Sequence, residues 1–435
     1  MPRRNTHKTL AAKAVRSRSL RSALSVMVAI VWFGGCSGAA EPRSSSGRAT
    51  VPSTPTRAAT SDGMGDRVND VDAALIDAAW DNDVDRARQL ISAGADVNKE
   101  DRSQQSAYLI ATSEGHVELL DLTLDHGADI RALDSYRETG LMRAAARGHA
   151  AIVGRLLRTE IDVDHVNTLG STALLEAIVL GDGSQRYIDT IRLLLAGGAN
   201  VGLASSRDGI TPLAHAEARG QTAVVRSLGA GLANPVVADP DGALLDAATR
   251  GDADRVALAL RARAALETRD GNERTPLLLA VANEQLDVAR LLVAIGADPD
   301  ALDDRHDTPW LVTGETGSVA MADVLLTARP DLTIRNRYGG VSIIPASERG
   351  HVDYVRRVAE TGIDVNHVND LGWTALLEAV ILGNGSEPYQ EIVQILLNAG
   401  ADPTIADRDG VTALEHARGN GQSEMVRILS SASLR

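Results

Sequence analysis

A three-residue turn recurs along this chain of 435 residues at an almost constant spacing. It reads Gly-Ala-Asp or a close variant, and successive copies are 33 residues apart except for one step of 32 and two of 38. The first positions of the turn are Gly94, Gly127, Glu160, Gly198, Gly231, Arg263, Gly296, Arg329, Gly362 and Gly400. With one more step, about eleven units fill the sequence from about Asp72 onward. A period of this length indicates a solenoid of stacked units and not a set of separate globular domains.

Each unit is expected to contain two helices and a hairpin-like connection to the next unit. Three units carry a Thr-Pro pair, at 211–212, 275–276 and 308–309. Such a pair places an N-cap hydroxyl before a proline at the first helical position. Second helices, such as the one expected over 288–295, show apolar residues at the spacing of one helical face. One helix pair cannot bury such a stripe alone, whereas stacked pairs bury it on both sides, so the sequence predicts an all-α array.

Several segments carry short motifs of one kind. They are TPLAHA at 211–216, RTPLLLA at 274–280, GHVELL at 115–120, LLVAIGADPDALD at 291–303 and DVNHVNDLGWTALLEA at 364–379. These motifs resemble the ankyrin repeat family, and the resemblance covers roughly residues 72–431. It implies an ankyrin-repeat solenoid of about 11 helix-turn-helix units with β-hairpin-like connecting fingers. It also implies that a protein partner is bound by the finger tips and by the groove along the first helices.

The chain departs from the family at the histidine of the TPLH turn. That position holds Ala214, Leu278, Leu311 and Leu175. An inter-repeat polar ladder is expected in its place, because charged or polar residues occupy one first-helix position in successive units. The ladder consists of Arg143, Glu176 and His215, repeated further along as Glu378 and His416. Each glutamate is expected to pair with the next histidine, although a charged stripe for a partner, or an acid/base pair, is an alternative.

Part of the array is duplicated. Residues 162–181 match 364–383 at an offset of 202, whereas 74–83 match 243–252 at an offset of 169. The offsets differ by one repeat, so a five-repeat block has been copied, and an extra unit at about 297–329 lies within the second copy. We assign repeats 1–5 to residues 72–231, an inter-block hairpin or linker to 232–242, and repeats 6–11 to 243–431. Because the step across the linker is 32 residues, we expect one continuous, curved stack.

Both copies carry the same five-residue insertion between paired helices, at Gly183–Tyr187 and at Gly385–Tyr389. Insertions in solenoids map to loops on one face. The insertion is interpreted as a tolerated loop inherited by copying. The alternative is a partner contact centred on Tyr187 and Tyr389.

The N-terminal 35 residues have the features of an export signal. Seven basic residues precede the first acid, Glu41, and an apolar run from Ala23 to Phe33 is followed by two glycines and Cys36. This resembles a bacterial lipoprotein signal, in which Cys36 becomes the lipid attachment site. A conventional cleaved signal with an incidental cysteine is the alternative. Residues 36–71 are rich in Ser, Thr, Ala, Gly and Pro and are predicted to form a disordered tether.

Charge limits the partners that the mature chain is expected to bind. Without residues 1–35 it has 37 basic and 58 acidic residues, a surface that repels nucleic acid and favours a basic protein. Nucleotide-binding loops, nucleophile motifs and paired metal ligands are missing from the sequence. We therefore expect no enzyme activity, no catalytic residues, no cofactor and no metal. A monomer that touches a membrane only through its lipid anchor is expected.

Partner-binding residues are expected among rings and charged groups at or beside finger tips. The candidates there are Tyr136, His165, Arg335, Arg337, Tyr338, His367 and Trp373, and Tyr187 and Tyr389 of the insertions are added to them. The leading hypothesis is an exported scaffold, anchored at the extracytoplasmic face of the bacterial cell envelope, that mediates protein–protein interaction with an unknown partner. Alternatives are a modulator or inhibitor of an envelope enzyme, a secreted effector if Cys36 is not lipidated, and a hydrolase that uses the Glu–His ladder.

Overall fold

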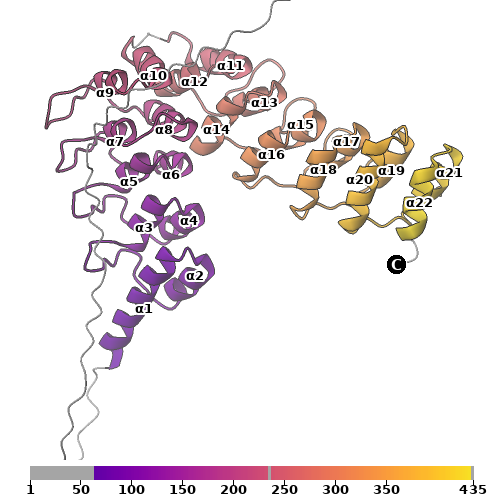
Figure 1. The fold of residues 1–435 in the computed structure, drawn as a ribbon, viewed down its shortest axis with the longest axis horizontal. Helices are drawn as coiled ribbons and strands as arrows, with labels where there is room; N and C mark the ends of the chain where they lie inside the picture. Colours follow the sequence, from indigo (N-terminus) through magenta and orange to yellow (C-terminus); the bar gives the residue numbers. More distant parts are fainter. Residues whose placement is uncertain (1–62, 234–236, 433–435) are drawn as a thin grey trace, which may run out of the picture. The chain divides into compact units, whose positions relative to one another are not determined.

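The computed structural model describes residues 63–233 and 237–432, with side chains from Val71 onward. These residues form twenty-two helices arranged as eleven antiparallel pairs (Figure 1). The first helices of the pairs are α1 (Gly63–Trp80), α3 (Ala107–Glu114), α5 (Gly140–Arg147), α7 (Ala173–Val179), α9 (Pro212–Ala218), α11 (Pro240–Arg250), α13 (Pro276–Ala282), α15 (Pro309–Thr316), α17 (Ile343–Glu348), α19 (Ala375–Ile381) and α21 (Ala413–Gly419). The second helices are α2 (Val84–Ser92), α4 (Val117–Asp125), α6 (Ala150–Leu156), α8 (Gln185–Ala196), α10 (Thr222–Ala233), α12 (Ala253–Arg261), α14 (Leu286–Ile295), α16 (Val319–Leu326), α18 (Val352–Ala359), α20 (Glu387–Asn398) and α22 (Ser423–Ala432). The predicted all-α repeat solenoid is confirmed.

The helix starts follow the predicted capping chemistry. The side chains of Thr211, Thr275 and Thr308 accept hydrogen bonds from the backbone N–H three residues later, at 3.3, 3.2 and 3.1 Å. Each of these threonines precedes a proline at the first helical position. The hydroxyl satisfies one of the free N–H groups of the first turn, and the proline removes another. Helix α1 begins at Gly63 and so extends into the last residues of the predicted tether.

The fingers that join one pair to the next carry little regular β-structure. Within the described ranges only two isolated antiparallel bridges occur in them, Leu133 with Thr139 and Ala406 with Thr412. The core lies between the helix layers and runs along the array as a continuous set of Leu, Ile, Val and Ala side chains. Trp310, Tyr108 and Tyr354 are the largest side chains that are completely buried in it. No described helix has both the length and the hydropathy needed to cross a bilayer.

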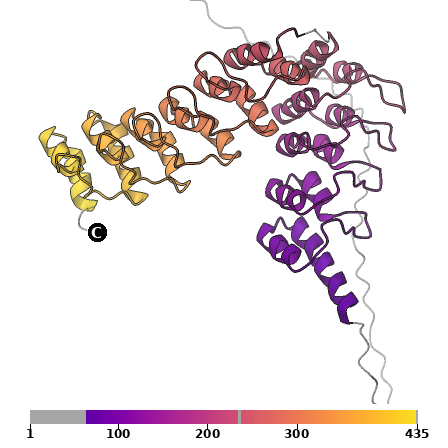
Figure 2. The ribbon, with the colours of Figure 1, turned by 180° about the vertical axis from the view of Figure 1, so that it is seen from behind.

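The stack is not continuous. From α1 to α10 and again from α11 to α22, each pair packs on the next, and we call these runs the first and second blocks. Between the blocks the row of first helices is interrupted, since α9 makes no extensive packing contact with α11. Helix α12 contacts α10 but packs much more extensively on α8, and α14 packs on α6 and α8 (Figure 1 and Figure 2). The expectation of one continuous, curved stack is therefore wrong. The row of first helices breaks between α9 and α11, and second helices of the second block pack on those of the first block; we call this contact the junction.

Charged groups and a close helix approach hold the junction together. Arg192 Nε of α8 donates to Asp254 of α12 at 2.8 Å, and Arg290 Nε of α14 donates to Asp189 of α8 at 2.8 Å. The Nη2 of Arg158 donates to the carbonyl of Ala294 at 2.8 Å. These contacts join residues that are between 62 and 136 positions apart in the chain.

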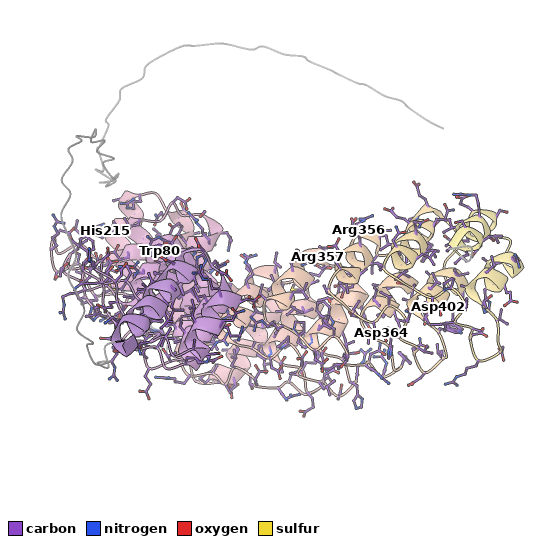
Figure 3. The ribbon with its side chains drawn as sticks, turned by 90° about the horizontal axis from the view of Figure 1, so that it is seen from below. Trp80, His215, Arg356, Arg357, Asp364 and Asp402 are labelled. Carbon is purple, nitrogen blue, oxygen red and sulfur yellow. The ribbon has the colours of Figure 1, made fainter. Side chains whose placement is uncertain are left out.

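A glycine allows the closest approach at the junction. A Cβ at Gly154 of α6 would lie only 2.2 Å from the carbonyl oxygen of Ala294 in α14, so no larger residue fits without movement. The equivalent position in the second block, 202 residues later, is Arg356, which is exposed on α18 and donates to Asp353 at 2.6 Å (Figure 3). The outer face of the second helix is thus covered at Gly154 of α6 and open at the equivalent position of α18.

Candidate partner-binding surface

An Asp or Asn side chain organises the tip of most fingers. The Oδ1 of Asn369 accepts hydrogen bonds from the N–H groups of Leu371 at 3.0 Å and Trp373 at 2.9 Å. The same arrangement recurs in seven other fingers, with Asp101, Asp134, Asn167, Asp270, Asp303, Asn336 or Asp407 as the acceptor. Because one acceptor fixes two backbone donors, the tip is held in one conformation. The residue two positions after the Asp or Asn is placed at the tip.

Large apolar side chains occupy that tip position in both blocks. Tyr136 is 57% exposed and Tyr338 is 54% exposed. Leu169 and Leu371, at the same place in the following fingers, are also exposed. Leu180 and Leu382, the residues that follow α7 and α19, are also exposed. We call Tyr136, Leu169 and Leu180 the first-block patch, and Tyr338, Leu371 and Leu382 the second-block patch.

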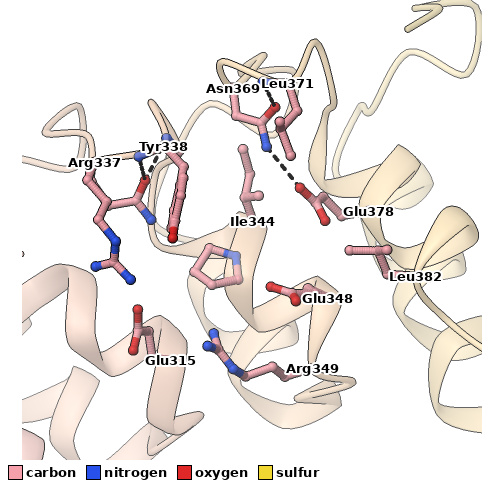
Figure 4. A pocket seen from close by; sticks show the side chains of 13 residues that line it. Glu315, Arg337, Tyr338, Ile344, Glu348, Arg349, Asn369, Leu371, Glu378 and Leu382 are labelled. Carbon is pink, nitrogen blue, oxygen red and sulfur yellow. Dashed lines mark hydrogen bonds between the residues drawn. The ribbon is translucent and has the colours of Figure 1, made fainter.

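The second-block patch borders a cavity of about 350 Å³ between α17 and α19 (Figure 4). Tyr338 lies on one side of it and Leu371 and Leu382 on the other, with Ile344 between them. The remaining lining is charged and polar: Glu315, Arg337, Glu348, Arg349, Asn369 and Glu378. This is a groove that offers apolar contact at its rim and carboxylates at its base.

Glu378 is the most perturbed acid of the groove. Its side chain is buried, and its Oε1 accepts a hydrogen bond from Asn369 Nδ2 at 2.8 Å. Burial, together with the nearby charge of Glu348, raises its pKa to about 7 despite that hydrogen bond. Glu176, the equivalent residue of the first block, accepts from Asn167 at 3.1 Å, and burial raises its pKa as well. Both copies therefore keep a carboxyl group in a place that disfavours its charge.

The residues of the predicted polar ladder are bonded mostly within their own units. Arg143 is the exception, because it donates to Asp134 of its own finger at 2.6 Å and to Gln105 of the preceding finger at 2.7 Å. His416 contacts Asp407 at 2.7 Å, and His215 lies 3.9 Å from Asp208. In the part of the chain that is described, neither glutamate shares a hydrogen bond or ion pair with the next histidine. The expected Glu–His pairing is not formed, because each side chain turns back toward its own finger.

The tyrosines of the two insertions are turned into the fold. Tyr187 is 5% exposed, and its hydroxyl donates to the carbonyl of Ala146 at 3.2 Å. Tyr389 is half-buried and donates to the carbonyl of Glu348 at 3.0 Å. The insertion lengthens the start of α8 and α20, and its tyrosine ring packs against the preceding repeat. A partner contact centred on these rings does not agree with this placement.

The other predicted partner residues lie at the fingers. Arg335 and Arg337 are exposed, and the guanidinium of Arg337 lies 4.6 Å from the centre of the Tyr338 ring. Trp373 is half-buried. His165 contacts the carbonyl of Arg137 at 2.9 Å, and His367 contacts that of Gly339 at 2.6 Å. Through these contacts each histidine links its own finger to the preceding finger.

The leucines of the patches were not among the residues expected from the sequence. An exposed leucine has no local signature in a repeat whose other leucines form the core. The recurrence of Leu169 and Leu180 at an offset of 202 was the available signal. Residues 1–35 and Cys36 lie outside the described residues, as does most of the predicted tether. No group of three or more potential metal ligands occurs in the described part of the chain.

Comparison with known families gives one consistent result. A model of three consecutive ankyrin repeats matches residues 75–167, 108–201, 141–239, 312–407 and 343–434, and a model of the single ankyrin repeat matches 272–304. YahD, named as an ankyrin repeat protein of Escherichia coli K12, is 37% identical over 187 residues, which are 43% of this chain and 93% of YahD. The B-cell lymphoma 3 protein homolog of mouse is 32% identical over 169 residues. This chain spans only 37% of the length of that mouse protein.

Two solved structures of ankyrin repeat proteins are similar to part of the chain. An ankyrin repeat domain from Acinetobacter baumannii AYE has 44% identity and a TM-score of 0.43, over 44% of this chain and 97% of the solved one. The ankyrin repeat protein EF0377 has 39% identity and a TM-score of 0.43, over the same shares.

Proposed function

We propose that this chain, which belongs to the ankyrin repeat family, is a scaffold that holds a protein partner on its finger tips and first-helix groove. The observation that carries the proposal is the gathering of Tyr338, Leu371 and Leu382 around a groove with a charged base. Exposed apolar side chains that gather at a rigid concave surface are typical of protein contact sites. Isolated exposed leucines would carry no such meaning.

The chemistry of the groove favours a partner segment that combines apolar and basic side chains. The apolar rim accepts an aliphatic or aromatic side chain, whereas Glu348 and Glu378 at the base attract a cation. Arg337 and Arg349 also line the groove, and Arg337 pairs with Asp307 at 3.0 Å. The acidic excess of the whole chain would also attract a basic protein over longer distances.

Site-specific photo-crosslinking in cells that produce the protein tests this function. A photoreactive amino acid replaces Leu371, and the matched control carries it at Gln394, which is exposed on α20. We expect the Leu371 position to give a discrete crosslinked product that is absent from the Gln394 position. The product should disappear when Tyr338→Ala and Leu382→Asp are added. Identical products from both positions, or none from Leu371, would refute a partner site in this groove.

The location of this scaffold is proposed from the sequence of its N-terminal segment. Seven basic residues, an apolar run and two glycines before Cys36 support export, with Cys36 as the lipid attachment site that anchors the protein at the cell envelope. Mass spectrometry of the mature N-terminus is the direct measurement. A first residue Cys36 that carries lipid, lost with Cys36→Ser, is expected. An unmodified Cys36, or retention of residues 1–35, would contradict the anchor.

A further inference from the structure

We propose that the first-block and second-block patches are two equivalent sites for the same segment, so that the scaffold binds a partner that presents one apolar and basic segment twice. This inference rests on the proposed function and extends it from one groove to two. Four of the exposed large apolar residues of the first block recur in the second at an offset of 202: Tyr136, Val166, Leu169 and Leu180 return as Tyr338, Val368, Leu371 and Leu382.

The duplicated blocks have diverged around these residues. Between 131–143 and 333–345, the tyrosine at position 136 and 338 is the only identical residue. By contrast, fifteen of the twenty residues in 162–181 are unchanged in 364–383. A surface side chain with no role would be expected to drift as its neighbours did. The tyrosine has thus been kept although the sequence around it has changed. The sequence of the adjoining finger and of α7 recurs with few changes in the second block.

Packing does not account for the retention of the two rings. Both tyrosines are more than half exposed, and a residue of any type can provide the backbone carbonyls that accept from Thr168 at 3.0 Å and from Asp370 at 2.9 Å. The arginine beside Tyr338 also has no counterpart, since Ser135 occupies the place of Arg337. What the two blocks share at this position is the exposed ring itself.

The two patches are built by the same set of contacts. In each block the Asn of the finger bonds the buried glutamate, Asn167 with Glu176 and Asn369 with Glu378. The finger histidine, His165 or His367, contacts the carbonyl that follows the tyrosine by one residue. Since these contacts fix the tyrosine, leucine and glutamate relative to one another, the same segment fits both patches.

Each patch also places a second carboxyl group near the buried glutamate. In the first block this is Glu138, whose Oε1 accepts from Asn167 at 3.0 Å, and in the second it is Glu348 of α17. Burial, together with the charge of Glu176, raises the pKa of Glu138, and burial, together with the charge of Glu348, raises the pKa of Glu378. A lysine or arginine of the partner beside the apolar anchor would stabilise the ionised acids in either patch.

Peptide selection on the purified full chain tests the equivalence. A phage library of random dodecapeptides is panned on the wild type, on Leu169→Asp, on Leu371→Asp and on the double variant. Leu302→Asp, an exposed finger leucine outside both patches, is the matched control. A synthetic peptide with the enriched sequence is then titrated by calorimetry. We expect both single variants to enrich the same apolar and basic sequence, with two peptides bound per wild-type or Leu302→Asp chain, one per single variant and none per double variant.

The other outcomes decide against the inference in distinguishable ways. Different enriched sequences for the two single variants, or one peptide per wild-type chain, would overturn the equivalence and leave the proposed function standing. If no enriched peptide depends on Leu169 or Leu371, both the equivalence and the proposed function are refuted. Circular dichroism of all four variants verifies that each retains the helical content of the wild type.

Discussion

At the residue scale, burial moves the pKa of Glu378 far from the ordinary value of a carboxyl group. Its pKa in the folded protein is raised to about 7, mainly by burial, from an ordinary value of 4.5. Between these two pH values the folded chain keeps a proton that the unfolded chain releases, so this group's contribution to stability falls as pH rises through that window. Below pH 4.5 the group is protonated in both states, and its contribution is fully present.

Glu378→Gln should therefore gain stability over the wild type as pH rises. The amide is neutral at every pH, and its oxygen still accepts from Asn369. We expect similar melting temperatures at pH 4.5 and an advantage for the variant of about 2 kcal/mol at pH 8. Thermal melting followed by circular dichroism across this range measures the difference. Glu176→Gln should change in the same direction, and a difference that does not vary with pH would contradict the raised pKa.

At the element scale, the finger depends on a single amide side chain. Asn369 accepts from the N–H groups of Leu371 and Trp373 and donates to Glu378. Asn369→Ala leaves two backbone donors and one buried carboxyl group without this partner, at a cost of about 2 kcal/mol. We expect amide hydrogen exchange at Leu371 and Trp373 to become faster, with weaker partner binding as the tip loosens. Asn369→Asp keeps the acceptor and should keep both amides protected; unchanged protection in the alanine variant would contradict this role.

Helix α8 shows how an inserted segment acquires a packing role. The Tyr187 ring lies beside Gly148 and Gly181 and bonds the last turn of α5, whereas Tyr136 projects from a finger. Tyr187→Ala should lower stability by about 3 kcal/mol because it leaves a cavity between repeats. Tyr136→Ala should change stability by less than about 0.5 kcal/mol and reduce binding instead. Equal melting of the two variants would show that Tyr187 does not pack as described.

Elements were the level at which the sequence was most informative. The period, the Thr-Pro caps and the apolar stripe predicted the helix pairs, because all three depend on local backbone chemistry. The exposure of Tyr136 and Tyr338 follows from their position two residues after Asp134 and Asn336. Burial of Tyr187 could not be predicted, because it depends on the path of the inserted segment over the preceding repeat. Glu378 and His416 of the predicted ladder illustrate the same limit, because the rotamer of each side chain decides which partner it contacts.

At the scale of the whole repeat array, the junction between blocks escaped prediction for a related reason. A step of 32 residues fits a continuous stack, and nothing local in the linker specifies another path. The junction instead depends on the shape of second-helix faces far apart in the chain. In the sequence, the junction is visible only as a difference between the two copies. Gly154 allows α6 to contact α14, whereas Arg356, at the equivalent position of α18, is exposed to solvent. The two blocks therefore meet through their second helices, whereas the patch residues, which lie on fingers and at the ends of first helices, stay exposed.

Substitution of the junction glycine tests that arrangement. A methyl group at Gly154 would meet the Ala294 carbonyl at 2.2 Å, so α6 and α14 have to separate. We expect Gly154→Ala to lower stability by about 1–3 kcal/mol. Small-angle X-ray scattering should record a change in the maximum dimension of the particle as the blocks move apart.

The matched control is another glycine to alanine change within a helix. Around Gly229 of α10 there is open space, so Gly229→Ala meets no obstacle and gains helix propensity of up to about 1 kcal/mol. It should leave the scattering profile unchanged. Since both variants add one methyl group to a second helix, a difference between them reports the contact between blocks and not the chemistry of the substitution. If Gly154→Ala behaved as Gly229→Ala does, α6 and α14 would not be in contact in solution. The expectation of one continuous stack would then be the better description of the array.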